Sequence, residues 1–155
     1  MEPIGIIYSP FTELENMPVQ PGGARDVEGL VRIEERYAEG LKDLDGFSHV
    51  YLIYIFHKAA RTRLTVTPFL DTRERGVFAT RSPLRPNHIG LSIVRLTKVE
   101  GCALTIRGVD VLNGTPLLDI KPYIENFDAV TGSSPGWMTA SAEEVSAARS
   151  DGRFV

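Results

Sequence analysis

The sequence predicts an all-β domain, and within that class a small, mostly antiparallel and partly closed β-barrel with one short helix near the C-terminus. Short apolar runs rich in β-branched and aromatic residues recur along the chain. The 14 glycines and 10 prolines favour many short elements over a few long helices. The length of 155 residues fits one domain, 1–155, and is long enough to bury a core without disulfides or metals.

The first third of the chain contains the strongest strand candidate. Strands are expected at Ile4–Tyr8, Leu30–Ile33 and His49–Phe56. The last of these is the most apolar run, so we expect a buried central strand there. Phe11–Arg25 has several prolines and glycines and no periodicity, and is therefore expected to be a long loop. Glu34–Leu41 is expected to form one or two helical turns.

The remaining strands are separated by clear turn signals, such as Asn113-Gly114. We expect them at Arg63–Phe69, Gly76–Thr80, Ile89–Val99, Ala103–Val109 and Leu117–Tyr123. In the last strand, alternation places Asp119, Lys121 and Tyr123 on one face, which is either exposed to solvent or part of a pocket. Near the C-terminus, Ser141 with Glu144 three residues later predicts a capping box that starts a short helix at Ser141–Ser150.

The charge distribution is uneven, although the net charge is only −3. Residues 1–57 carry 4 Lys/Arg against 10 Asp/Glu, residues 58–98 carry 9 against 2, and residues 99–155 carry 4 against 8. The basic middle third is either a solvated surface that pairs with the acidic N-terminal third or a phosphate-facing patch. The overall negative charge argues against a general nucleic-acid-binding protein.

Known sequence motifs exclude several classes of site. The three histidines are scattered, no CxxC or HxxxH spacing occurs, and no metal site is expected. There is no GxGxxG motif after a strand, no Walker motif and no GxSxG elbow. We expect neither a signal peptide nor a membrane span, because MEPIGIIYSP lacks a basic region and a long apolar core and no apolar run approaches the length of a span. The single cysteine, Cys102, cannot form an internal disulfide, which favours a cytoplasmic location.

The most distinctive stretch is Ala79–Ser92, ATRSPLRPNHIGLS. Its prolines fix two φ angles, and its two arginines, Arg81 and Arg85, present guanidinium groups suited to an anion or a planar polar group. The residue pattern alone fits a solvated hairpin connection, with no binding role, equally well. Other polar positions near strand ends or glycines are the loop Gln20–Arg25, the pair His57-Lys58 and the loop Asp110–Pro116.

Taken together, FATRSPLRPNHIGLS, DVLNGTPLLDIKPYI and LDGFSHVYLIYIFHK make the chain resemble the TrmO/TsaA-like family from Ile4 to about Tyr123. This resemblance implies a barrel core at about 4–123 with a C-terminal extension at 124–155. It also implies a homodimer and an S-adenosyl-L-methionine-dependent tRNA methyltransferase. The reaction would be N6-methylation of the threonylcarbamoyl-modified adenosine 37 in tRNA.

The resemblance also implies which residues contact the cofactor. Those residues are Gln20, Pro21, Gly22, His57, Lys58, Arg81, Leu91, Asn113, Gly114, Thr115 and Pro116. The attacking N6 is amide-like and a poor nucleophile, so a catalytic base would help. Asp119, His57 and Tyr123 are the candidates, with Lys121 as an electrostatic aid. A mutual ion pair is the alternative for Asp119 and Lys121.

The sequence departs from the family pattern in three ways. Asn113 replaces the usual aspartate, His88 replaces the usual proline, and the C-terminal domain of longer members is absent from this chain. Two other functions therefore remain open. The chain is alternatively a non-catalytic barrel module that binds adenine nucleotides or RNA, or a methyltransferase acting on another small substrate.

Overall fold

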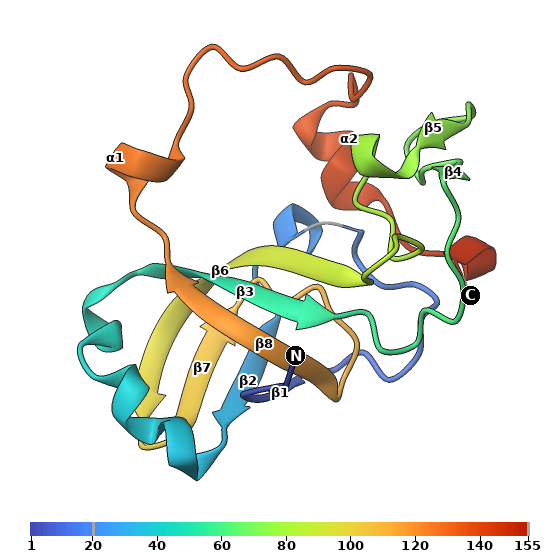
Figure 1. The fold of residues 1–155 in the computed structure, drawn as a ribbon. Coiled ribbons are helices and arrows are strands. Elements are labelled where there is room, and N and C mark those ends of the chain that lie inside the picture. The colour runs from blue at the N-terminus through green and yellow to red at the C-terminus, as the bar shows by residue number, and fades with distance from the viewer. Residues whose placement is uncertain (20, 155) are drawn as a thin grey trace.

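A computed structural model describes residues 1–19 and 21–154, and its centre is a closed six-stranded barrel (Figure 1). The strands follow one another around the barrel in the order β1-β2-β7-β6-β3-β8, and every neighbouring pair is antiparallel. The barrel confirms the predicted all-β class, although its closure is complete rather than partial. Its strands are β1 (Gly5–Tyr8), β2 (Glu28–Ile33), β3 (His49–Ile55), β6 (Ile89–Glu100), β7 (Ala103–Arg107) and β8 (Thr115–Pro122).

The core follows from the two-residue alternation of the strands. Ile7, Val31, Leu52, Leu104 and Leu117 come from five different strands, and each is at most 1% exposed. The predicted strand at His49–Phe56 is β3, which lies between β6 and β8. In β3 only every second side chain is buried, because the other face of the strand lies on the outside of the barrel.

The segment between β3 and β6 differs from the prediction. Of the expected strand Arg63–Phe69, only β4 (Thr65–Val66) is a strand, and it pairs with β5 (Arg75–Gly76) in a separate two-stranded sheet. The expected strand at Gly76–Thr80 is instead a 3-10 helix at Val77–Ala79. Its apolar, β-branched composition suits a strand, but without a neighbouring strand to complete a ladder the backbone turns.

Short helices fill the connections. The 3-10 helices are Pro21–Ala24, Glu35–Leu41, Leu44–Gly46, Val77–Ala79 and Gly152–Phe154. Within the described residues, two short α-helices follow the barrel, α1 (Glu125–Asp128) and α2 (Ala142–Ala147), and α2 lies within the predicted helix Ser141–Ser150. The predicted capping box is confirmed: Glu144 N–H donates to Ser141 Oγ at 3.1 Å, and Ser141 N–H donates to Glu144 Oε2.

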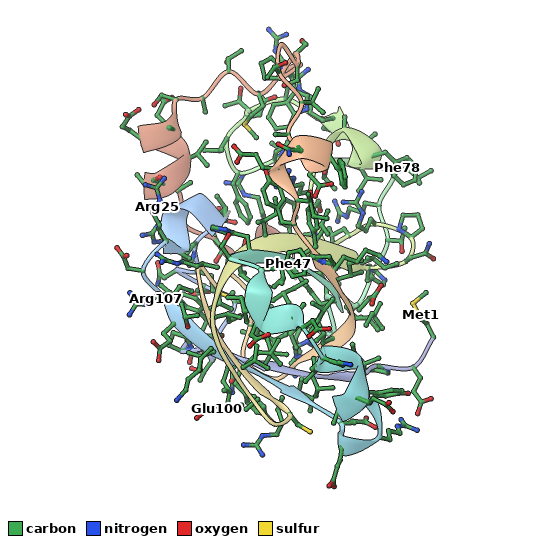
Figure 2. The ribbon with its side chains drawn as sticks, turned by 90° about the vertical axis from the view of Figure 1, so that its left-hand side faces the viewer. Met1, Arg25, Phe47, Phe78, Glu100 and Arg107 are labelled. Atoms are coloured by element: carbon green, nitrogen blue, oxygen red, sulfur yellow. The ribbon has the colours of Figure 1, made fainter. Side chains whose placement is uncertain are left out.

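The two ends of the barrel are covered unequally. Figure 2 shows Glu100, in the hairpin between β6 and β7, and Phe78 at opposite ends of the molecule. The β4–β5 segment and the C-terminal segment with α2 lie together over one side of the barrel (Figure 1). The end of β3 and the start of β6 are adjacent, because Ile55 pairs with Ile89. Within the described residues, no helix is both long and apolar enough to cross a membrane.

Candidate functional site

A cavity of about 990 Å³ lies between the end of the barrel where β3 stops and β6 begins and the segments that cover that end. Its walls come from five parts of the chain: the N-terminal loop, the end of β3, the region 68–91, the connection from β7 to β8, and the C-terminal segment. Such a volume lies in the range of cavities that bind small molecules. Because these segments are distant in sequence, only the folded chain assembles the cavity.

The floor of the cavity is formed by Tyr54 and Asp110, which are joined through Ser92 by a chain of hydrogen bonds. The Tyr54 hydroxyl lies 3.0 Å from Ser92 Oγ, and Ser92 Oγ donates to Asp110 Oδ1 at 2.7 Å. Tyr54 and Ser92 are 4% and 3% exposed. Burial raises the pKa of Tyr54 well above its usual value, so its hydroxyl stays protonated. Burial also raises the pKa of Asp110 to about 6, although the Ser92 hydrogen bond and the Arg81 charge oppose the rise.

Gly90 fixes the position of the Tyr54 ring. A Cβ atom at Gly90 would lie 2.2 Å from Tyr54 Cε2, so only glycine leaves room for the ring. The ring also packs edge-on against Phe56, with 5.4 Å between the ring centroids. The glycine of the IGLS motif is therefore required for close packing under the cavity.

The predicted pair His57-Lys58 follows β3 and lines the cavity. A turn positions His57, whose N–H donates to the Ile55 carbonyl at 2.8 Å. Partial burial, and then the nearby Lys58 charge, lower the pKa of His57 below its ordinary value. The environment of His57 therefore favours the neutral form of its ring.

The arginine-bearing loop is also part of the cavity, where both Arg81 and Arg85 line the wall. Arg85 Nη1 donates to the Thr80 carbonyl at 3.2 Å and so braces the loop. His88 has a left-handed backbone (φ +50°), and its Nδ1 lies 2.8 Å from the Pro83 carbonyl oxygen. Proline, with φ fixed near −65°, could not adopt this conformation, so the loop as it stands requires a residue other than proline at position 88.

The turn Asn113–Pro116 contributes less to the cavity than its motif suggests. Thr115 lines the wall and is buried, with its Oγ1 donating to the Leu112 carbonyl. Asn113 instead ties the turn to the segment just after β1: its Oδ1 accepts from Ser9 N–H at 3.1 Å, and its N–H donates to the Phe11 carbonyl. Asparagine therefore fulfils a structural role here without a charge.

Residues of the C-terminal segment complete the wall. Trp137 lines the cavity, and its Nε1 donates to the Ala79 carbonyl at 2.8 Å. Ser150 is hydrogen-bonded to both Leu14 and Met17 in the N-terminal loop. Arg153 Nη1 donates to the Pro68 carbonyl at 2.9 Å. The extension therefore joins the N-terminal loop to the region after β4, and sequence patterns gave no signal for this role.

Two of the three predicted bases lie away from the cavity walls. Asp119 forms an ion pair of 3.3 Å with Lys121 along the outside of β8. The Tyr123 ring packs edge-on against Tyr51, at 5.7 Å between centroids. Of the three, only His57 lines the cavity. The catalytic roles of all three stay predictions.

The other predicted residues are placed as follows. Leu91, at the start of β6, lines the cavity and is 53% exposed. Pro21 and Gly22 begin the 3-10 helix Pro21–Ala24, after the cavity-lining Val19, and Gln20 lies outside the described residues. Within the described part of the chain, no group of three or more His, Cys, Asp or Glu residues could hold a metal ion.

Comparison with known proteins gives a consistent result. A probable S-adenosyl-L-methionine-binding protein of Pyrococcus abyssi is 50% identical over 152 residues, covering 98% of this chain and 83% of that protein. The human tRNA (adenine(37)-N6)-methyltransferase is 40% identical over 135 residues, which is 83% of this chain but 31% of that protein. The crystal structure of TrmO from Pseudomonas aeruginosa has a TM-score of 0.74 and 40% identity over 88% of this chain and 60% of that one.

The chain thus spans about a third of the human enzyme and about 60% of the bacterial TrmO structure. A family model described as the tRNA-methyltransferase O N-terminal domain matches residues 6–129, which include the whole barrel apart from the first residue of β1. We conclude that this chain belongs to the family of the tRNA-methyltransferase O N-terminal domain.

Proposed function

We propose that the protein is an S-adenosyl-L-methionine-dependent methyltransferase that methylates N6 of adenosine 37 in tRNA. The observation that carries the proposal is the single cavity, which brings together His57, Lys58, Arg81, Leu91 and Thr115 from separate segments. The named activity of the human relative supports the reaction. We further propose that the substrate adenosine carries a threonylcarbamoyl group.

The residues of the cavity fit the proposed cofactor. Its volume of about 990 Å³ is ample for a nucleoside joined to an amino acid. Lys58 and Arg81 can bind the cofactor's carboxylate, the arginine in a bidentate fashion. Leu91 offers an apolar surface for the adenine ring. When bound, S-adenosylmethionine supplies a methyl group activated by the positive sulfonium, and the protein's task is to align it with the attacking nitrogen.

The remaining predicted contacts belong to the same proposal. The loop residues Gln20, Pro21 and Gly22 would offer backbone groups to the cofactor, since glycine allows close approach. The turn Asn113–Pro116 would contribute through Thr115, which lines the cavity. Of the three predicted bases, His57 is the one that lines the cavity, where it would also contact the cofactor.

We also propose that the protein is a homodimer whose partner covers the outer face of β3 and β6. There Tyr51 pairs across the strands with Ile93, and Ile53 pairs with Leu91. Leu91 and Ile93 are 53% and 39% exposed, so the face is apolar and accessible. Because Leu91 also lines the cavity, the covered face would reach the edge of the site. Asp119 pairs with Ile53 from the other side and would lie at the dimer interface.

The basic middle third supports tRNA as the substrate. Arg61, Arg63 and Arg73 lie in the segment between β3 and β6 and are exposed, close in sequence to the cavity-lining residues 68–70 and 78–85. Cationic side chains at the edge of the site suit the phosphates of an RNA substrate. The single cysteine agrees with the cytoplasm as the proposed location.

Methyl transfer tests this function directly. The purified protein is incubated with S-adenosylmethionine labelled in its methyl group and with tRNA that carries or lacks the threonylcarbamoyl group. We expect label in adenosine 37 of the modified tRNA. Cofactor binding with no transfer to any tRNA would instead favour the non-catalytic binding module, and transfer only to a small molecule would favour the third alternative.

The Arg81→Ala variant tests whether the Arg81 side chain contributes to binding of the cofactor. Loss of a charge-assisted hydrogen bond costs about 1.5–3 kcal/mol, so Arg81→Ala should weaken cofactor binding by about 10- to 150-fold. Arg32→Ala is the matched control, because Arg32 is exposed on β2 and lines no part of the cavity. Calorimetric titration of both variants with S-adenosylmethionine gives the comparison, and equal affinities would contradict the proposed carboxylate contact.

A further inference from the structure

Asp110 is a carboxylate that lines the cavity but has no role in the function described so far. It follows β7 and stands before the turn that leads into β8, and the sequence motif pointed to the loop rather than to this residue. Its neighbours Val109 and Val111 are buried in the core, at 1% and 4% exposure. The backbone of Asp110 is therefore anchored by a core side chain on each side in the sequence, while Asp110 itself lines the cavity.

The hydrogen bonds around Asp110 have a defined direction. Ser92 Oγ donates its only proton to Asp110 Oδ1 at 2.7 Å, so the Tyr54 hydroxyl must be the donor in the 3.0 Å contact with Ser92. The chain of two hydroxyl groups therefore ends on Asp110 and stabilises its ionised form. It also fixes the carboxyl group, because the Tyr54 ring is held by Gly90 and Phe56.

The charged groups around the cavity suit a reactive carboxylate. The positive charge of Arg81, in the arginine-bearing loop, opposes the rise in the pKa of both Asp110 and Tyr54. The cavity is also lined by His57, Lys58, Arg85 and Asp151. Burial nevertheless keeps the pKa of Asp110 at about 6, so at neutral pH the group is ionised yet more basic than an ordinary aspartate. His57 is a weaker base than usual, because burial and Lys58 lower its pKa.

We infer that Asp110 is the catalytic base that accepts the proton from the attacking N6. The inference rests on the proposed function. As N6 forms its bond to the methyl carbon, the bond between that carbon and sulfur breaks, and its electron pair stays on sulfur, which becomes a neutral thioether. The N6 proton passes to the Asp110 carboxylate, which afterwards releases it to water. Asp119, on the outer face and paired with Lys121, is not needed as the base in this mechanism.

Asp110→Asn is the first test, because asparagine keeps the shape and can still accept the Ser92 hydrogen bond. Turnover is measured against pH with saturating S-adenosylmethionine and modified tRNA, and cofactor affinity is measured by calorimetry. Loss of a general base predicts a decrease in kcat of about 10²- to 10⁴-fold with cofactor affinity unchanged. Asp45→Asn is the control, because Asp45 is exposed and lines no part of the cavity, and it should retain the wild-type kcat.

Ser92→Ala is the second test, which does not require removal of the carboxylate. The Ser92 hydrogen bond lowers the pKa of Asp110, so its loss raises that pKa. Because the base must be ionised, kcat rises with pH through the pKa of Asp110, and in Ser92→Ala this rise should move to higher pH. A role in packing alone would lower stability without moving the profile.

The outcomes are distinct. A normal kcat in Asp110→Asn, or a loss explained wholly by weaker cofactor binding, would overturn the assignment while leaving the methyltransferase function intact. A pH profile that is unchanged in Ser92→Ala would also overturn it. If the wild-type protein transfers no methyl group to any tRNA, the proposed function itself fails. Should Asp110→Asn fold poorly by circular dichroism, the pH profile of Ser92→Ala decides the question.

Discussion

Replacement of Gly90 by alanine tests how tightly the floor of the cavity is packed. The new Cβ atom would lie 2.2, 2.5 and 2.8 Å from three carbons of the Tyr54 ring. Real Cβ atoms do not approach this closely, so the ring or the strand must shift. Tyr54 is 4% exposed and is held by Phe56, which leaves the ring little space to move.

The expected cost is that of overpacking a core. Such insertions destabilise a protein by about 1–3 kcal/mol, and the better strand propensity of alanine recovers less than about 1 kcal/mol of this. For a domain of this size each kcal/mol lowers Tm by about 2–4 °C, so Gly90→Ala should melt several degrees below the wild type. Displacement of the ring should also break the contact between Tyr54 and Ser92.

Differential scanning calorimetry and urea titration measure the loss. The matched control is Gly40→Ala, because a Cβ atom at the exposed Gly40 meets nothing within 4 Å and that glycine has no positive φ. The control should be within about 0.5 kcal/mol of the wild type or slightly more stable. A Gly90→Ala protein as stable as the control would refute the packing described for the floor of the site.

Three further perturbations test other parts of the molecule. The pKa of Asp110 is raised from an ordinary 3.8 to about 6. Its contribution to the free energy of unfolding is therefore present below pH 4 and is lost as the pH rises to 6, by at most about 3 kcal/mol. Urea titrations at several pH values should show this loss in the wild type and not in Asp110→Asn. Trp137→Ala removes the hydrogen bond to Ala79 and the Arg75 cation–π contact, which together are worth about 1–2 kcal/mol. Limited proteolysis should therefore cut the C-terminal segment faster in this variant than in the control Phe127→Ala, whose ring is 80% exposed. Equal cleavage rates would contradict the role of Trp137 in anchoring this segment. In sedimentation experiments, Ile93→Asp should convert the proposed dimer to a monomer. The control Ile6→Asp should not, because Ile6 is equally exposed at 40% but lies on β1. A monomeric wild-type protein would disprove the proposed dimer.

The strands of the barrel could be predicted from the sequence because the signals for strands and turns lie within short stretches of the chain. Alternation in Ile89–Val99 and Leu117–Tyr123, together with the turn dipeptide Asn113-Gly114, indicated strands that the structure contains. The strand predicted at Gly76–Thr80 was wrong because composition indicates a preference for extended backbone but supplies no partner strand.

The site could be predicted only in part. The family resemblance implied His57, Lys58, Arg81, Leu91 and Thr115, and all five line one cavity, although their contacts with a cofactor stay predictions. The chain of hydroxyl groups that ends on Asp110 joins residues 18 and 38 positions apart, so no local pattern contains it. The contacts of Ser150 with the N-terminal loop span more than 130 residues, for the same reason.

The measurement that tests the central proposal most directly is methyl transfer to tRNA that differs only in the threonylcarbamoyl group at adenosine 37. With labelled S-adenosylmethionine, we predict that the wild-type protein labels N6 of that adenosine, that the label depends on the threonylcarbamoyl group, and that Asp110→Asn binds the cofactor but transfers almost no label. A wild-type protein that binds the cofactor and leaves both tRNAs unlabelled would contradict the proposed function.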